Sequence, residues 1–62
     1  MDNLPMLDPK PLLKRALRRR EVAWEMYMYF VRRHDATQAE EQIKKFRFWT
    51  EEVRIYGRLV NK

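Results

Sequence analysis

Six basic side chains, crowded near the start of this sequence, are the residues best suited to chemistry. They occupy positions 10 to 20 with no acid among them: Lys10, Lys14, Arg15, Arg18, Arg19 and Arg20. The whole chain carries a formal net charge of +5, which is compatible with an anionic partner. As the alternative to a small regulator or adaptor that binds proteins, all of these cations except Arg20 would form a nucleic-acid site that contacts the phosphates of DNA or RNA and reads no bases. The alternative is an ordinary solvated helix surface.

By contrast, the sequence contains few of the residue types that catalyse reactions. The sequence has no serine and no cysteine, so it lacks two of the usual nucleophiles and cannot form a disulfide. His34 is its single histidine and Gly57 its single glycine. A histidine metal cluster and a glycine-rich phosphate loop are therefore excluded. We expect a protein that is not an enzyme and that binds no metal or cofactor.

Apolar side chains form the second feature, in the stretch VAWEMYMYFV at positions 22–31. On a helix these residues point apolar groups in nearly every direction, and one neighbouring helix cannot cover them all. Methionine and aromatic residues are enriched at protein interfaces. The residues predicted to bind a protein partner are Trp24, Met28, Tyr29, Phe48, Trp49, Ile55 and Leu59. The alternative is that the same side chains fill the core of a homodimer.

Helices are the elements that must position these side chains. Asp8 followed by Pro9 is typical of a helix N-cap and first helical position. We predict an N-terminal tail over 1–8 and a single domain over 9–62. Within that domain, the predicted elements are a helix over about 9–34, a turn over about 34–37 and a second helix over about 38–61.

Two overlapping signals mark the start of the second helix. Thr37 with Glu40 matches a capping box, and Asp35 with Gln38 is the alternative. No glycine closes the first helix, so one continuous long helix is the remaining alternative.

Each predicted helix carries an apolar series at four-three spacing, which is typical of bundles and coiled coils. In the first helix the series is Leu13, Leu17, Trp24, Tyr27 and Val31, flanked by Leu12, Ala16, Ala23, Met26 and Phe30. In the second helix it is Ala39, Ile43, Phe46, Thr50, Val53, Gly57 and Val60, with Phe48, Ile55 and Leu59 on the opposite side. Because a helix with two apolar sides needs more than one neighbour, we predict an all-α fold. It is a two-helix antiparallel hairpin that pairs with a second copy into a homodimeric four-helix bundle. This architecture is similar to that of small plasmid-type four-helix dimers, although no motif carries the similarity.

Arg20 interrupts the first series between Leu17 and Trp24. Its stem could pack while its charged head stays in solvent. The alternative is an inter-chain ion pair with Glu52, which would set the register of the dimer.

The longest uncharged run of the helical part covers 26–31, far short of the roughly 20 residues that a membrane span needs. We see no signal-peptide pattern, and the absence of cysteine fits a reducing compartment. We therefore expect a cytoplasmic protein without a membrane span. A basic helix lying on an anionic membrane is a further alternative.

Overall fold

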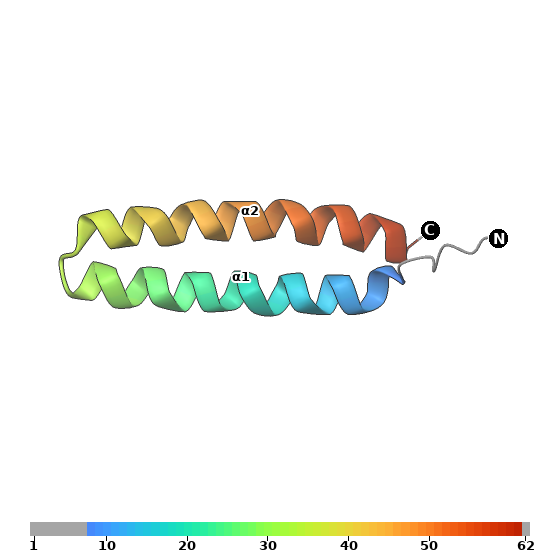
Figure 1. The fold of residues 1–62 in the computed structure, drawn as a ribbon, viewed down its shortest axis with the longest axis horizontal. Helices are drawn as coiled ribbons and strands as arrows, with labels where there is room; N and C mark the ends of the chain where they lie inside the picture. Colours follow the sequence, from blue (N-terminus) through green and yellow to red (C-terminus); the bar gives the residue numbers. More distant parts are fainter. Residues whose placement is uncertain (1–7, 62) are drawn as a thin grey trace.

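A computed structural model describes residues 8–61 of the chain. These residues form two helices, α1 (Pro9–Arg32) and α2 (Ala36–Val60), which lie antiparallel and side by side in one layer (Figure 1). The prediction of an all-α hairpin is confirmed, and the alternative of one continuous helix is wrong. Most of the predicted N-terminal tail, residues 1–7, lies outside the described residues.

The start of α1 follows directly from the sequence. Asp8 is the N-cap, and its carboxylate accepts a hydrogen bond from the Lys10 backbone N–H at 3.0 Å. Pro9 occupies the first helical position, where a missing N–H breaks no helical hydrogen bond. Local chemistry alone therefore places this end of the helix.

The end of α1 is a Schellman motif built without glycine. The Asp35 N–H donates to the Phe30 carbonyl at 2.9 Å, and the His34 N–H donates to the Val31 carbonyl at 3.0 Å. His34 has a backbone φ of 58°, the left-handed conformation that this motif requires. The chain leaves α1 there and turns sharply back toward α2.

The same turn selects the N-cap of α2. Asp35 caps the helix by accepting a hydrogen bond from the Gln38 N–H at 3.1 Å. Thr37 instead lies inside the first turn of α2, so the Thr37 capping box is not used. The reason is that the Schellman motif already directs the chain at Asp35 into a new helix, two residues earlier than the Thr37 cap predicts.

The buried part of the contact between the helices is made of small side chains. The buried residues among those described are Ala16, Ala23 and Ala39, and no large side chain is fully buried. We refer to these three residues as the alanine contact. Alanine adds little bulk, so it lets two helices approach closely and leaves the larger side chains beside the line of contact. The hairpin therefore has a thin core.

The two apolar series behave differently in this packing. Every member of the α2 series is buried or half-buried. In α1, however, Leu17, Trp24 and Val31 are between 39% and 44% exposed, although the spacing placed them in the helical contact. The cause is that α1 turns its flanking stripe, with Ala16 and Ala23, toward α2.

Candidate functional site

Large side chains of both helices form one broad face beside the alanine contact. With 3.6 residues per turn, Leu17 and Trp24 project to one side of the alanines of α1. We call this side the apolar face. The residues that line its two hollows are Leu17, Arg20, Glu21, Trp24 and Phe46 in one, and Tyr27, Val31, His34, Asp35, Ala36, Ala39, Glu40 and Ile43 in the other.

Trp24 connects the two hollows of the apolar face. Its ring centroid lies 5.2 Å from that of Phe46 on α2 and 5.3 Å from that of Tyr27 on α1. These distances are typical of packed aromatic pairs. Trp24 is still 44% exposed, so the hairpin leaves much of this aromatic cluster uncovered.

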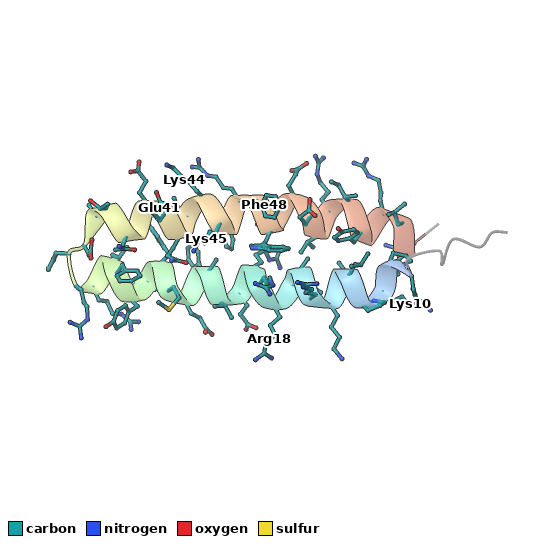
Figure 2. The ribbon with its side chains drawn as sticks, viewed as in Figure 1. Lys10, Arg18, Glu41, Lys44, Lys45 and Phe48 are labelled. Atoms are coloured by element: carbon teal, nitrogen blue, oxygen red, sulfur yellow. The ribbon has the colours of Figure 1, made fainter. Side chains whose placement is uncertain are left out.

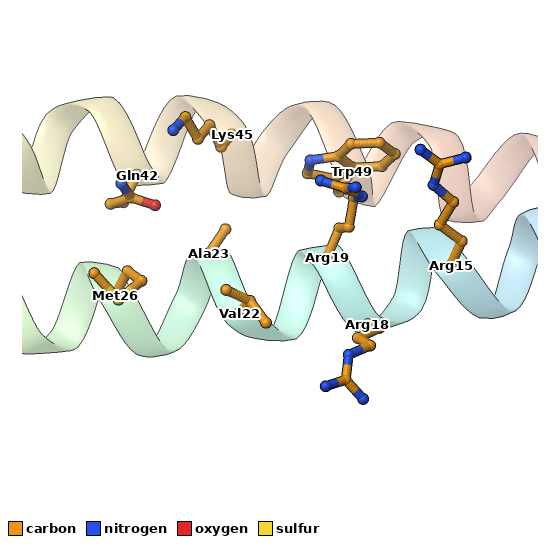
Figure 3. A pocket seen from close by; sticks show the side chains of 9 residues that line it. All are labelled: Arg15, Arg18, Arg19, Val22, Ala23, Met26, Gln42, Lys45 and Trp49. Carbon is orange, nitrogen blue, oxygen red and sulfur yellow. The ribbon is translucent and has the colours of Figure 1, made fainter.

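The opposite face carries a groove with a different chemistry, shown in Figure 3. Its volume is about 530 Å³, and we call it the basic groove. The residues that line it are Arg15, Arg18, Arg19, Val22, Ala23, Met26, Gln42, Lys45 and Trp49. Cations of both helices thus border an apolar floor made by α1.

Arg19 is held across the basic groove by a cation–π contact. Its guanidinium carbon lies 5.6 Å from the centroid of the Trp49 ring, within the range in which such contacts are attractive. Arg15 also reaches toward α2, whereas Arg18 points away from it (Figure 3). The groove therefore presents Arg15 and Arg19 together and leaves Arg18 at its edge.

The predicted phosphate-binding residues are only partly brought together. Arg15, Arg18 and Arg19 line the basic groove, but Lys10 and Lys14 do not. Lys10 lies at the start of α1, at the far end of the helix pair (Figure 2). The segment 10–20 is thus spread around the helix, because Lys10, Lys14 and Arg18 repeat every four residues along one side and Arg15 and Arg19 repeat every four residues along the next.

Lys45 and Trp49 complete the basic groove, and sequence reasoning did not assign either to a phosphate site. The sequence pattern groups Trp49 with the protein-binding residues and does not distinguish Lys45 from the other exposed lysines. They lie about 30 residues from the arginines of α1, and no local spacing connects the two segments. Only the pairing of the helices reveals this neighbourhood.

The predicted protein-binding residues do not form one site. Trp24 belongs to the apolar face, and Trp49 lines the basic groove. Tyr29 lies under Arg33, whose guanidinium carbon is 4.9 Å from the ring centroid. Met28 is half-buried on α1. Hence no single partner surface contains all seven residues.

The other three protein-binding residues share a stripe on the outer side of α2. Phe48, Ile55 and Leu59 are between 45% and 56% exposed, and we call them the outer stripe. Phe48 also packs against Trp49, with ring centroids 4.9 Å apart in an edge-on arrangement. All three side chains are thus exposed, on the side of α2 that the sequence pattern predicts to lie opposite its four-three series.

Arg20 and Glu52 have separate surroundings. Arg20 lines the apolar face beside Trp24 and Phe46. Glu52 accepts a hydrogen bond from the Tyr56 hydroxyl at 3.1 Å. Within residues 8–61 of one chain, no ion pair joins Arg20 to Glu52. The inter-chain pair needs a second subunit and stays a prediction.

The hydrogen bond to Glu52 raises the pKa of Tyr56 above its ordinary value of 10.0. The carboxylate holds the phenolic proton, and partial burial and the negative charge of Glu52 act in the same direction. The positive charge of Arg15 has a smaller, opposite effect on the pKa of Tyr56.

Ion pairs on α2 are local and exposed. Lys44 lies 3.8 Å from Glu41, and Arg54 pairs with Glu51. Both acids are three residues from their partners, and Glu41 and Lys44 point away from α1 (Figure 2). Among residues 8–61, no ion pair involves Arg15, Arg19 or Lys45. The cations of the basic groove are thus not neutralised within this part of the chain.

Within residues 8–61, no group of three histidine, cysteine, aspartate or glutamate side chains is placed to hold a metal ion. Neither described helix is apolar over enough of its length to cross a membrane. Comparison with models of known protein families, with curated proteins and with solved structures finds no significant match. The two faces of the hairpin must therefore be interpreted from their own residues.

Proposed function

We propose that this protein is a small, non-enzymatic helical regulator or adaptor of the cytoplasm that acts by protein–protein binding. Its first partner is a second copy of itself, in a homodimeric four-helix bundle closed by the two apolar faces. One observation carries this proposal. Leu17, Trp24 and Val31 of α1 stay exposed on one face, whereas the buried residues among those described are all alanines.

The different burial of the two apolar stripes of α1 supports a bundle. In a four-helix bundle the residues of each four-three series point to the common centre, and side-by-side helices touch through the flanking positions. In α1, Ala16 and Ala23 belong to the flanking stripe and are buried, whereas in α2 the buried Ala39 belongs to the four-three series. Leu17, Trp24 and Val31 belong to the four-three series of α1, and in the bundle the helices of a second subunit would cover them.

The size of the apolar face also suits a second copy. A helix of 25 residues such as α2 is about 37 Å long, and two helices side by side are about 20 Å wide. The face therefore measures about 750 Å², close to the ~800 Å² that each partner contributes to a standard interface. A chain of 62 residues without cysteine gains from this association the core it cannot build alone.

The outer stripe is the surface we propose for a further protein partner. In a bundle closed by the apolar faces, Phe48, Ile55 and Leu59 stay on the outside of α2. They would give the dimer two equivalent docking surfaces, one for each subunit.

Sedimentation equilibrium of two serine variants tests the dimer. Leu17→Ser with Val31→Ser on the apolar face is expected to yield a monomer that has lost much of its helical circular dichroism. Phe48→Ser with Leu59→Ser on the outer stripe is the matched control, and it should keep the mass of a dimer. A monomeric wild-type protein contradicts the bundle. Unfolding or dissociation of the control shows that the outer stripe is core and not a docking surface.

A further inference from the structure

The basic groove differs from the apolar face in being charged, and it lies on the other side of the hairpin. Arg15 and Arg19 line it from α1, and Lys45 lines it from α2. A bundle closed by the apolar faces leaves this groove open to solvent. Whatever the groove binds is therefore independent of the proposed dimer.

We propose that the basic groove binds single-stranded nucleic acid, with phosphates on Arg15, Arg19 and Lys45 and a base stacked on the Arg19–Trp49 pair. Non-specific single-strand binding combines a positively charged groove that follows the backbone with aromatic rings on which bases stack. Both components meet in this groove. Arg15 and Arg19 come from α1, Lys45 and Trp49 come from α2, and the hairpin brings the four together.

Charge complementarity identifies the ligand as an anion. The three cations form no ion pair within the described part of the chain, so phosphates can replace counterions around them. The residues that line the groove include four cations and no acid. The groove therefore keeps a positive potential.

The Arg19–Trp49 pair supplies the stacking platform. The guanidinium carbon of Arg19 lies 5.6 Å from the centroid of the Trp49 ring. Because this contact already restricts the Arg19 side chain, less conformational entropy is lost when a ligand binds. Exposed bases stack on aromatic rings and on guanidinium planes. Gln42, on the same wall, offers an amide that can donate to or accept from a base edge.

The residues that line the groove favour a single strand over a duplex. A duplex keeps its bases stacked and presents mainly phosphates. The Trp49 platform and the apolar floor of Val22 and Met26 would then contact no base. Lys10 and Lys14, which would add phosphate contacts along a duplex, lie outside the groove. An acidic protein segment would match the charge but would bring no base to stack.

Fluorescence anisotropy with the full chain tests this site. The probe is a labelled mixed-sequence single strand of about 16 nucleotides, the upper end of the site size of a small binding fold. Titrations are made at about 50 and 200 mM salt. The groove variant is Arg15→Gln, Arg19→Gln and Lys45→Gln. Its matched control is Arg32→Gln, Arg47→Gln and Arg58→Gln, which removes the same charge from exposed positions outside the groove.

The groove variant is expected to bind at least tenfold more weakly at the lower salt concentration. Its plot of log affinity against log salt should be shallower by about 2, because each phosphate contact on a single strand contributes about 0.7. The control should stay within about threefold of wild type, since distant charges are screened over about 10 Å. Circular dichroism confirms that each variant keeps its helices.

Tryptophan emission reports the stacking directly. In a Trp24→Phe protein only Trp49 emits, and saturation with the single strand should quench it. Four results would each overturn the proposal. These are an equal loss of affinity in the control variant, equal or tighter binding of a duplex of the same sequence, displacement of the strand by polyglutamate at matched charge, and an unchanged emission of Trp49.

Discussion

His34 ends α1 in a conformation that glycine usually occupies. Its φ of 58° brings the Cβ of an L-residue close to the following carbonyl oxygen, which costs about 1–2 kcal/mol. The chain accepts this cost because two backbone hydrogen bonds of the Schellman motif depend on it. Histidine is also among the residues that tolerate this region better than most.

Replacing His34 with glycine is expected to stabilise the protein. The substitution removes the strain, and the gain should be about 0.5–1 kcal/mol after the greater freedom of the unfolded chain is counted. Urea unfolding followed by circular dichroism measures it. Thr37→Gly, inside the first turn of α2, is the control and should destabilise by a similar amount. A less stable His34→Gly protein would show that the imidazole contributes to the apolar face.

Tyr56 gives the fold a dependence on alkaline pH. Its pKa is raised in the folded chain by the hydrogen bond to Glu52, so folding favours the protonated phenol. The resulting stability is fully present below the unfolded pKa near 10 and is lost as pH rises through the higher folded value.

Replacing Glu52 with glutamine should lower the pKa of Tyr56 toward 10. The neutral amide accepts the phenolic proton less strongly and does not repel the phenolate. Ultraviolet titration in a Tyr27→Phe, Tyr29→Phe background isolates Tyr56. An unchanged pKa in the Glu52→Gln protein would mean that the hydrogen bond of 3.1 Å does not persist in solution.

At the scale of elements, the helix ends follow from capping chemistry. Asp8 and Asp35 each satisfy an N–H that the helix leaves unpaired. In α2 the cap also joins the turn, since the same residue donates its N–H to the Phe30 carbonyl. One aspartate therefore ties the end of α1 to the start of α2.

Asp35→Ala is expected to destabilise the hairpin by about 1 kcal/mol, the usual value of an N-cap. Thr37→Ala is the matched control and should change stability little, because its side chain caps nothing in this arrangement. Thermal unfolding of the two variants decides between the caps. A larger loss for Thr37→Ala would restore the capping box and move the start of α2.

Across the whole molecule, two faces of unlike chemistry flank one thin line of contact. The apolar face gathers Leu17, Trp24 and Phe46, and the basic groove gathers Arg15, Arg19 and Lys45. A layer of two helices cannot bury both sides of itself. Association through one face and ligand binding through the other is the arrangement that our proposals describe.

Arg20→Leu tests how the apolar face closes. Arg20 lines this face beside Trp24 and Phe46, so leucine should extend the apolar contact between subunits. We expect an unchanged oligomer with a higher melting temperature, because removing a desolvated charge from an apolar interface is often stabilising. A changed oligomer or a lower melting temperature would instead support an inter-chain ion pair between Arg20 and Glu52 that sets the register.

Much of the fold can be read from the sequence because it depends on neighbours in the chain. Asp8 and Pro9 begin the first helix, and the alternation of four-three spacing marks both helices. The outer stripe of Phe48, Ile55 and Leu59 is also local, since residues three and four apart share a face of any helix.

Which stripe of α1 packs against α2 depends on both helices, so it could not be predicted from the sequence of α1 alone. Leu17, Trp24 and Val31 fit the four-three series as well as any residues, yet the smaller Ala16 and Ala23 lie between the helices. The same long-range packing brings Lys45 and Trp49 to Arg15 and Arg19. Local sequence thus decides where this chain is helical and how charged it is. Which side chains meet across the hairpin, and so which face is apolar and which is basic, depends on how closely two helices can pack.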